Sequence, residues 1–195
     1  MRAFELEPPL SEEQVRELRV GDRVYISGLI LGMRDATLIR LLDHGQPSPV
    51  NLQGQVVLHT APNVRKNGEV YVPLSVGTTT SARMDRFTRG LLDLGVRAII
   101  GKGGLYREDS LRALQEKGGV YLAIVGGAAA WETSKIEAIE KVFWEYLMPE
   151  CLWVFRVRGL GPLFVGIDSH GGNLYREILV QAEAKLAKLK ELWER

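Results

Sequence analysis

The chain has 195 residues, with 25 basic and 24 acidic side chains and a formal net charge of +1. Its length suits one domain with a core of its own, and 46% hydrophobic with 25% charged residues is the balance of a globular protein. A net charge this close to zero excludes the broad basic surface of a nucleic-acid-binding protein and the polybasic tail of a membrane-binding one, so we expect neither partner.

The cysteine count limits the chemistry further. Cys151 is the one cysteine, so no intrachain disulfide can form and a disulfide-rich secreted scaffold is excluded. One thiolate cannot hold an iron–sulfur cluster, which takes three or four. The histidines show no metal-ligand spacing, so no metal site is expected in this chain. Residues 1–20 carry charges throughout and no stretch approaches 18 apolar residues, which predicts a cytoplasmic protein without a membrane span.

The first half of the chain predicts short strands separated by turns and helices. Ser11 precedes two glutamates and is expected to cap a short helix. Gly28 lies within an apolar run and suggests a β-bulge or a close backbone approach. In chain order, the expected elements are a helical turn after Ser11, a strand at 24–31, a helix at 34–42, a strand at 55–59, a turn-rich segment at 61–68 and a strand at 69–76.

The second half alternates strands and helices more clearly, which indicates an α/β fold. Ser81 is expected to cap the first of its helices. The expected elements are a helix at 82–94, a strand at 96–100, a helix at 107–117, a strand at 120–125, a helix at 131–140, two strands at 152–157 and 163–167 that pair with each other, and a long amphipathic helix at 175–195.

The strongest local signal for chemistry is the segment VGTTTSARMDRF at 76–87. A strand ends there, a loop of glycine and hydroxyl residues follows, and a helix begins. Free amides at a helix start form an anion site with the helix dipole, and Arg83 adds a planar fork that can hold a carboxylate through two hydrogen bonds. These residues indicate a carboxylate or phosphate site, although an ordinary capped loop with a surface arginine explains them equally well.

Two further basic residues follow predicted strands. Lys102 lies in a Gly-Lys-Gly-Gly turn, and Arg34 precedes Asp35 after the first apolar strand. Taken singly, a tight turn with a solvated lysine and a surface ion pair account for them. Because ligands of α/β sheets collect beyond the carboxyl ends of strands, Arg34, Arg83 and Lys102 could also converge on one dianion.

In their order along the chain, these motifs resemble a known family: the β subunit, or C-terminal domain, of class I iron–sulfur fumarases and L(+)-tartrate dehydratases. The resemblance extends from about residue 5 to about residue 175, and the loop that runs into ARMD is its most specific part. The segments that carry it are ISGLILGMRDAT, VVLHTAP, SVGTTTSARMD, GVRAIIGKGG, GGVYLAIVGGAAA, and ECLWVFRV through LFVGIDSHGGNLY.

The resemblance implies a swivelling β/β/α domain over residues 1–175, which the amphipathic helix at 176–195 extends. It also implies a partner α subunit that holds a [4Fe–4S] cluster through three cysteines and whose open iron binds the substrate, so that this chain alone binds no cofactor. We expect the two kinds of subunit to form an α2β2 assembly or one with β–β contacts.

The resemblance also implies roles for single residues. Arg34, Arg83 and Lys102 would bind the substrate carboxylates, and Thr79, with Thr80 beside it, would remove the C3 proton. The family usually has Gly-Pro-Thr-Thr where this chain has a third threonine after Gly77, so the base is uncertain by one position. A second departure is Leu38, which stands where the family usually has histidine.

The expected activity is the reversible hydration of fumarate to L-malate, a reaction of the tricarboxylic acid cycle, and it requires the α subunit. The sequence leaves L(+)-tartrate dehydratase open as an alternative. A non-catalytic carboxylate-binding or scaffolding subunit is the alternative from another class of function.

Overall fold

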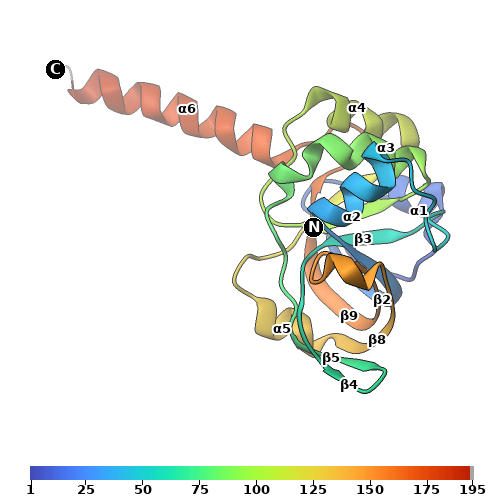
Figure 1. The fold of residues 1–195 in the computed structure, drawn as a ribbon. Coiled ribbons are helices and arrows are strands. Elements are labelled where there is room, and N and C mark those ends of the chain that lie inside the picture. Colours follow the sequence, from blue (N-terminus) through green and yellow to red (C-terminus); the bar gives the residue numbers. More distant parts are fainter. Residues whose placement is uncertain (194–195) are drawn as a thin grey trace.

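A computed structural model describes residues 1–193 of the chain (Figure 1). The strands are β1 (Ala3–Leu6), β2 (Arg23–Met33), β3 (Val56–His59), β4 (Asn63–Asn67), β5 (Val70–Ser75), β6 (Ala98–Gly101), β7 (Val120–Ala123), β8 (Ile136–Phe143) and β9 (Leu152–Ile167). The α-helices are α1 (Glu12–Arg16), α2 (Asp35–Leu38), α3 (Thr88–Asp93), α4 (Glu108–Lys117), α5 (Ala129–Ser134) and α6 (Leu174–Trp193). Shorter helical turns are Ile39–Asp43, Ser81–Arg83, Asp85–Phe87 and Glu145–Leu147.

Five strands close into a ring. β2 pairs with β3, β3 with β6, β6 with β7 and β7 with β9, and β9 returns to pair with β2. The first four strands run parallel, and β9 runs antiparallel to both of its neighbours in the ring. β1 and β8 extend the sheet beside β2 and β9, whereas β4 and β5 form a separate hairpin. The mixed α/β fold with flanking helices and a long C-terminal helix, predicted from the sequence, is confirmed.

The strands of the ring are apolar on both faces. In β3, Val56 and Leu58 belong to the inner hydrophobic core, and Val57 between them belongs to a second core on the outside. Parallel strands covered on both faces read as continuous apolar runs rather than as alternating ones, which is why they were recognisable in the sequence. Figure 1 shows α2, α3 and α4 beside one another against the sheet, where their apolar side chains complete the outer core.

The helix α6 extends away from the rest of the molecule (Figure 1). Its apolar side chains Ile178, Leu179, Val180, Leu186 and Leu189 are all exposed. No helix among the described residues 1–193 has the length and apolar character needed to cross a membrane. The last two residues of the predicted helix at 175–195 lie outside the described part.

Several local predictions are confirmed. Ser11 caps α1: its hydroxyl accepts a hydrogen bond from the N–H of Gln14, and its own N–H donates one to Gln14 Oε1. Gly28 has φ of +108° at a register shift between β2 and β9, so it marks the expected bulge. The helix predicted at 107–117 ends at Gly118, whose left-handed conformation closes α4.

Two segments form strands that the sequence did not predict. The helix expected at 131–140 stops at Ser134 and gives way to β8, because pairing with the long strand β9 overrides the helical preference of Glu and Ala residues there. The turn-rich segment at 61–68 contains β4, which forms a hairpin with β5 through a two-residue turn at Gly68 and Glu69.

The predicted pairing of 152–157 with 163–167 is wrong. The two segments belong to one strand, β9, which continues through Gly161 and Pro162 and pairs along its length with other strands instead. Ser81 is not the helix cap that the sequence suggested. Thr80 holds the cap position without a side-chain cap, and Ser81 is fully buried.

Candidate functional site

The threonine loop, residues 77–81, lies across the carboxyl ends of two strands of the ring, β3 and β6. The N–H of Thr79 donates to the carbonyl of His59 at the end of β3, over 2.8 Å. Thr80 forms a parallel bridge with Lys102, directly after β6, and the Ser81 N–H donates to the Lys102 carbonyl over 3.1 Å. The backbone therefore fixes the loop at the sheet edge where ligands of such folds bind.

Thr79, Arg83, Asp35 and Arg34 form one connected polar cluster at this edge. Arg83 Nη2 donates to Thr79 Oγ1 over 2.9 Å and lies 3.5 Å from Asp35 Oδ2. Arg34 Nε donates to the same Asp35 oxygen over 3.0 Å. Two of the three predicted basic residues thus meet around one carboxylate, which the sequence analysis had treated only as a surface partner of Arg34.

Glu150 completes the polar surroundings of Arg34. Its Oε1 lies 3.2 Å from Arg34 Nε, and its Oε2 accepts a hydrogen bond of 2.8 Å from the N–H of Ala36 at the start of α2. The carboxylates of Asp35 and Glu150 hold Arg34 in place without using its two terminal amino groups, which make no hydrogen bond to the described residues. Those groups are the natural donors for a bound carboxylate.

Lys102 stands apart from the arginines. A side chain built on Gly126 would come within 3.3 Å of the Lys102 Cδ atom, so the lysine runs past this glycine. It takes no part in the ion pairs that Arg34 and Arg83 form with Asp35. Thr80 pairs with Lys102 through the backbone, whereas the hydroxyl of Thr79 contacts Arg83.

A buried hydrogen-bonded relay supports the loop from below. Ser81 Oγ lies 3.0 Å from His59 Nδ1 and accepts a bond of 2.9 Å from the Tyr121 hydroxyl, which also lies 2.9 Å from the carbonyl of Gly103. A side chain at Gly101 would collide with Ser81 Oγ, so only glycine fits there. The relay joins β3, β7, the threonine loop and the glycine–lysine turn. The sequence analysis named Ser81 only as a helix cap and missed its contact with Tyr121, because nothing in the spacing of the two residues shows that they meet.

Because His59 in the relay is buried, we expect acid to destabilise the protein. Burial lowers the pKa of His59 to about 4, although the charge of Asp35 acts in the opposite direction. An unfolded chain binds a proton on this imidazole below its ordinary pKa of about 6.5, while the folded protein does not. Stability should therefore fall as the pH drops from about 6.5 towards 4, by about 2–3 kcal/mol from this residue.

Urea unfolding at about pH 7.5 and pH 4.5 measures this loss. His59→Gln should show a difference in unfolding free energy between the two pH values that is smaller by about 2–3 kcal/mol. His170→Gln, at an exposed histidine, is the matched control and should keep the wild-type difference. If the unfolding free energy of His59→Gln fell between the two pH values as much as that of the wild type, the relay would not be the acid-sensitive element.

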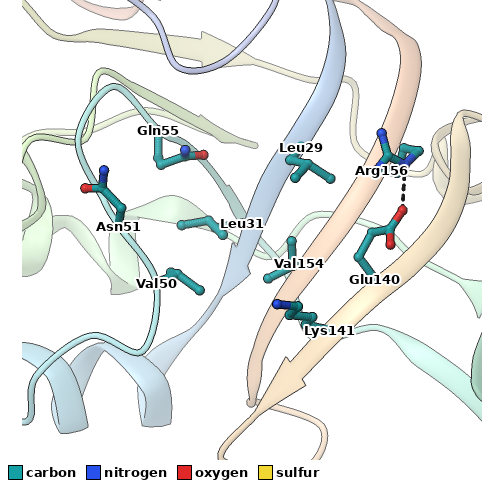
Figure 2. A pocket seen from close by; sticks show the side chains of 9 residues that line it. All are labelled: Leu29, Leu31, Val50, Asn51, Gln55, Glu140, Lys141, Val154 and Arg156. Atoms are coloured by element: carbon teal, nitrogen blue, oxygen red, sulfur yellow. Dashed lines mark hydrogen bonds and ion pairs between the residues drawn. The ribbon is translucent and has the colours of Figure 1, made fainter. Parts of the chain in front are cut away.

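The hollow drawn in Figure 2 lies elsewhere. It encloses about 310 Å³ on the outer face of β2, β8 and β9, and none of the residues predicted for the site contributes to it. Figure 2 shows the ion pair of Arg156 and Glu140 at its rim. Of the predicted residues, Thr80 and Arg83 are exposed, the Arg83 side chain to 51%, whereas Arg34, Thr79 and Lys102 are half-buried. The lining residues of the hollow are Leu29, Leu31, Val50, Asn51, Gln55, Glu140, Lys141, Val154 and Arg156.

The residues of this chain do not fit an iron–sulfur cluster. Cys151 is fully buried, with its sulfur near the Glu145 carbonyl and the Met148 sulfur, and burial raises its pKa to about 11. It is therefore a protonated core thiol and not a metal ligand. Among residues 1–193, no group of three or more His, Cys, Asp or Glu side chains is placed to hold a metal ion.

Comparison with known proteins shows the family of the chain. The family described as "Fumarase C-terminus" matches residues 1–178, which is nearly the whole chain and includes every residue of the polar cluster. The chain belongs to the Fumarase C-terminus family.

Individual members of the Fumarase C-terminus family match over most of the chain. The L(+)-tartrate dehydratase subunit beta of Escherichia coli (strain K12) is 39% identical over 176 residues, which cover 88% of this chain and 86% of that protein. A putative L(+)-tartrate dehydratase subunit beta of Methanocaldococcus jannaschii is 36% identical over 92% of this chain and 95% of its own. A putative fumarate hydratase class I of Geobacillus stearothermophilus is 41% identical over 97% of this chain, which corresponds to 37% of its own length.

Proposed function

We propose that this chain is the β subunit of a hydro-lyase for a four-carbon dicarboxylate, catalysing the reversible hydration of fumarate to L-malate. The observation that carries the proposal is the contact between Arg83 and Thr79, beside Arg34, at the carboxyl ends of strands of the ring. A hydroxyl group and two guanidinium groups lie together there, which suits proton transfer next to a bound carboxylate.

The roles follow from the contacts. The free terminal amino groups of Arg34 and the remaining donors of Arg83 would each hold a carboxylate of the substrate, and Lys102 with Thr80 would border it on the opposite side of the loop. Thr79 would remove the C3 proton. Arg83 donates to the Thr79 oxygen, so its positive charge would stabilise the alkoxide and lower the hydroxyl pKa. Arg83 would thus be the group on this chain that activates the threonine.

The openness of the site supports the need for a partner. Sites for small molecules usually enclose most of the ligand, but Thr80 and Arg83 lie on exposed surface. An α subunit that covers this surface would complete the site and would hold the [4Fe–4S] cluster, for which this chain has no ligand set. The relatives named as beta subunits support such a pairing. An α2β2 or β–β assembly, a swivelling β/β/α domain over 1–175, and a cytoplasmic location remain predictions.

L(+)-tartrate dehydratase is the alternative function, and the names of two relatives favour it. The two substrates differ in hydroxyl groups and not in their carboxylates, so the arginine cluster suits both. Leu38 cannot select between them, because its apolar side chain forms no hydrogen bond and is fully buried in the outer core. A non-catalytic carboxylate-binding or scaffolding subunit is the alternative from another class.

Reconstitution tests the proposal. We expect the purified chain alone to be colourless and inactive, and anaerobic co-expression with a chain that carries three cluster cysteines to yield a brown complex that interconverts malate and fumarate. Turnover of tartrate in place of malate would establish the alternative substrate. A correctly assembled complex with no activity on malate, fumarate or tartrate would favour the non-catalytic subunit, and a stoichiometric cluster on the lone chain would contradict the division of roles.

A further inference from the structure

Glu150 comes to Arg34 from a distant part of the chain, the connection between β8 and β9. Its two carboxylate oxygens have separate contacts: Oε1 lies 3.2 Å from Arg34 Nε, and Oε2 accepts a hydrogen bond of 2.8 Å from the N–H of Ala36. The backbone carbonyl of Glu150 accepts a further bond from the Thr37 hydroxyl. The residue is therefore fastened to the segment that carries Arg34 by two bonds that do not involve Arg34 itself.

The connection between β8 and β9 is also held from within the fold. Trp153, which is fully buried in β9, donates from Nε1 to the carbonyl of Pro149 over 3.0 Å. Earlier in the connection, the Arg40 guanidinium lies over the rings of Trp144 and Tyr146, 5.2 and 5.1 Å from their centroids. The position of the glutamate carboxylate is therefore set by the packing of this connection and not by the arginine that it faces.

Asp35 is a less exclusive partner of Arg34. Its Oδ2 atom accepts a hydrogen bond of 3.0 Å from Arg34 Nε, and the same oxygen lies 3.5 Å from Arg83 Nη2. The two arginines thus share one carboxylate oxygen. Among the described residues, Glu150 forms an ion pair with Arg34 and with no other basic side chain. If Arg83 moves towards a substrate carboxylate, Glu150 is the partner of Arg34 that stays unchanged.

These contacts determine which edge of the Arg34 guanidinium is free. A guanidinium can hold a carboxylate through its two terminal amino groups, or through Nε and one of them. Asp35 and Glu150 both lie against Nε, so the edge that includes Nε is occupied. The two terminal amino groups are left for an incoming carboxylate, which must approach Arg34 end-on.

We propose that Glu150 is a positioning residue, which holds Nε of Arg34 and thereby presents the two terminal amino groups to one carboxylate of the substrate. The inference rests on the proposed function. Glu150 itself neither contacts the substrate nor transfers a proton. A guanidinium that is already oriented loses less freedom when it binds, so the contribution of Glu150 should appear in affinity and hence in KM.

Glutamine at position 150 is a sharp test, because it has one acceptor oxygen where glutamate has two. If the amide oxygen faces Ala36, the amide N–H groups face Arg34 Nε and two donors meet. In the reverse orientation the donors meet at Ala36, and a neutral amide holds a guanidinium less strongly than a carboxylate does. The bond from Thr37 goes to the backbone carbonyl, so the variant should keep the connection in place.

Steady-state kinetics of the reconstituted complex measure the effect. Glu150→Gln should raise KM for the dicarboxylate by about tenfold and change kcat by less than about threefold, because Arg34 holds the carboxylate both before and during the reaction. Glu140→Gln is the matched control and should follow the wild type, since Glu140 pairs with Arg156 Nε outside the candidate site. An unchanged KM in Glu150→Gln would overturn the proposal.

A second background separates positioning from a structural role. Arg34→Gln removes the guanidinium, so a residue that acts through Arg34 has nothing left to orient. Adding Glu150→Gln to Arg34→Gln should therefore change KM by less than about twofold. If glutamine instead disturbed the start of α2, where the bond to Ala36 is at risk, KM would increase equally in both backgrounds, and that result would contradict a positioning role.

Nitrogen-15 NMR relaxation of the Arg34 Nε–H group in the full chain alone tests the orientation without turnover, with Arg34→Gln used for assignment. The order parameter of this group should be about 0.8 in the wild type and below about 0.6 in Glu150→Gln. Glu140→Gln should lower the value for Arg156 and leave that of Arg34 unchanged.

The two measurements distinguish this inference from the proposed function. A lowered order parameter in Glu150→Gln, alongside a complex that turns over no dicarboxylate, would refute the proposed function and leave the positioning of Arg34 in place. An order parameter of Arg34 that Glu150→Gln does not change would overturn the positioning role, whatever the substrate.

Discussion

Replacing Thr79 by valine in the reconstituted complex is expected to lower kcat by about 10²–10⁴-fold, the usual contribution of a general base. Valine keeps the shape of threonine and removes the oxygen that Arg83 contacts over 2.9 Å. KM should change little, because the arginines that hold the carboxylates remain. Steady-state kinetics on malate and tartrate measure the effect, after cluster content and assembly have been shown to match the wild type.

Neighbouring threonines provide controls for the one-position ambiguity. Thr78 has a buried hydroxyl oxygen without a hydrogen-bond partner in the described chain, and Thr80 is exposed beside Lys102. Thr78→Val and Thr80→Val should therefore retain most of kcat, and Thr79→Ser should retain more activity than Thr79→Val. Loss in Thr80→Val with retention in Thr79→Val would move the base by one position. Retention in all three valine variants would place the base on the partner subunit.

Replacing Arg83 by lysine should lower kcat/KM by the equivalent of about 2–5 kcal/mol, the typical cost of breaking a charged hydrogen-bonded contact in binding. Lysine keeps the positive charge but not the planar fork, so it cannot contact Thr79, Asp35 and a substrate carboxylate together. The loss should appear in kcat as well as in KM, because Arg83 both binds the carboxylate and stabilises the Thr79 alkoxide.

Arg86 is a matched control three residues further along. It is similarly exposed, pairs with Asp43 over 2.7 Å and does not contact the threonine loop, so Arg86→Lys should retain kcat/KM within about threefold. Equal losses in Arg83→Lys and Arg86→Lys would indicate a general effect of surface charge. A change in KM alone for Arg83→Lys would limit Arg83 to binding and would leave the activation of Thr79 unexplained.

The sequence predicted the four parallel strands of the ring well because their apolar runs depend on burial from both sides. It failed where distant pairing decides the structure. The segment that forms β8 favours a helix locally, and β9 contains glycine and proline residues that usually end a strand. Both segments become strands because each has a partner strand far away in the sequence, which no local pattern reveals.

In the candidate site, too, the sequence showed the local motifs but not the contacts between distant segments. The threonine loop and the glycine–lysine turn were visible as glycine and hydroxyl residues after strands, and the roles of Thr79, Arg83, Arg34, Lys102 and Thr80 stay predictions. The sequence analysis did not find the contact of Asp35 with Arg83, because it joins the start of α2 to a helical turn far away in the sequence. Such contacts between separate segments are what the fold adds to the motifs.

The pairing of β2 with β9 has a consequence for synthesis of the protein. Arg23 pairs with Phe164 and Gly32 with Trp153, so more than a hundred residues must be translated before β2 gains this partner. At usual ribosomal rates this takes on the order of 10 seconds. During that time the ring cannot close, and one apolar strand of the nascent chain keeps an unsatisfied edge. Chaperone binding should therefore concentrate on nascent chains that end before β9.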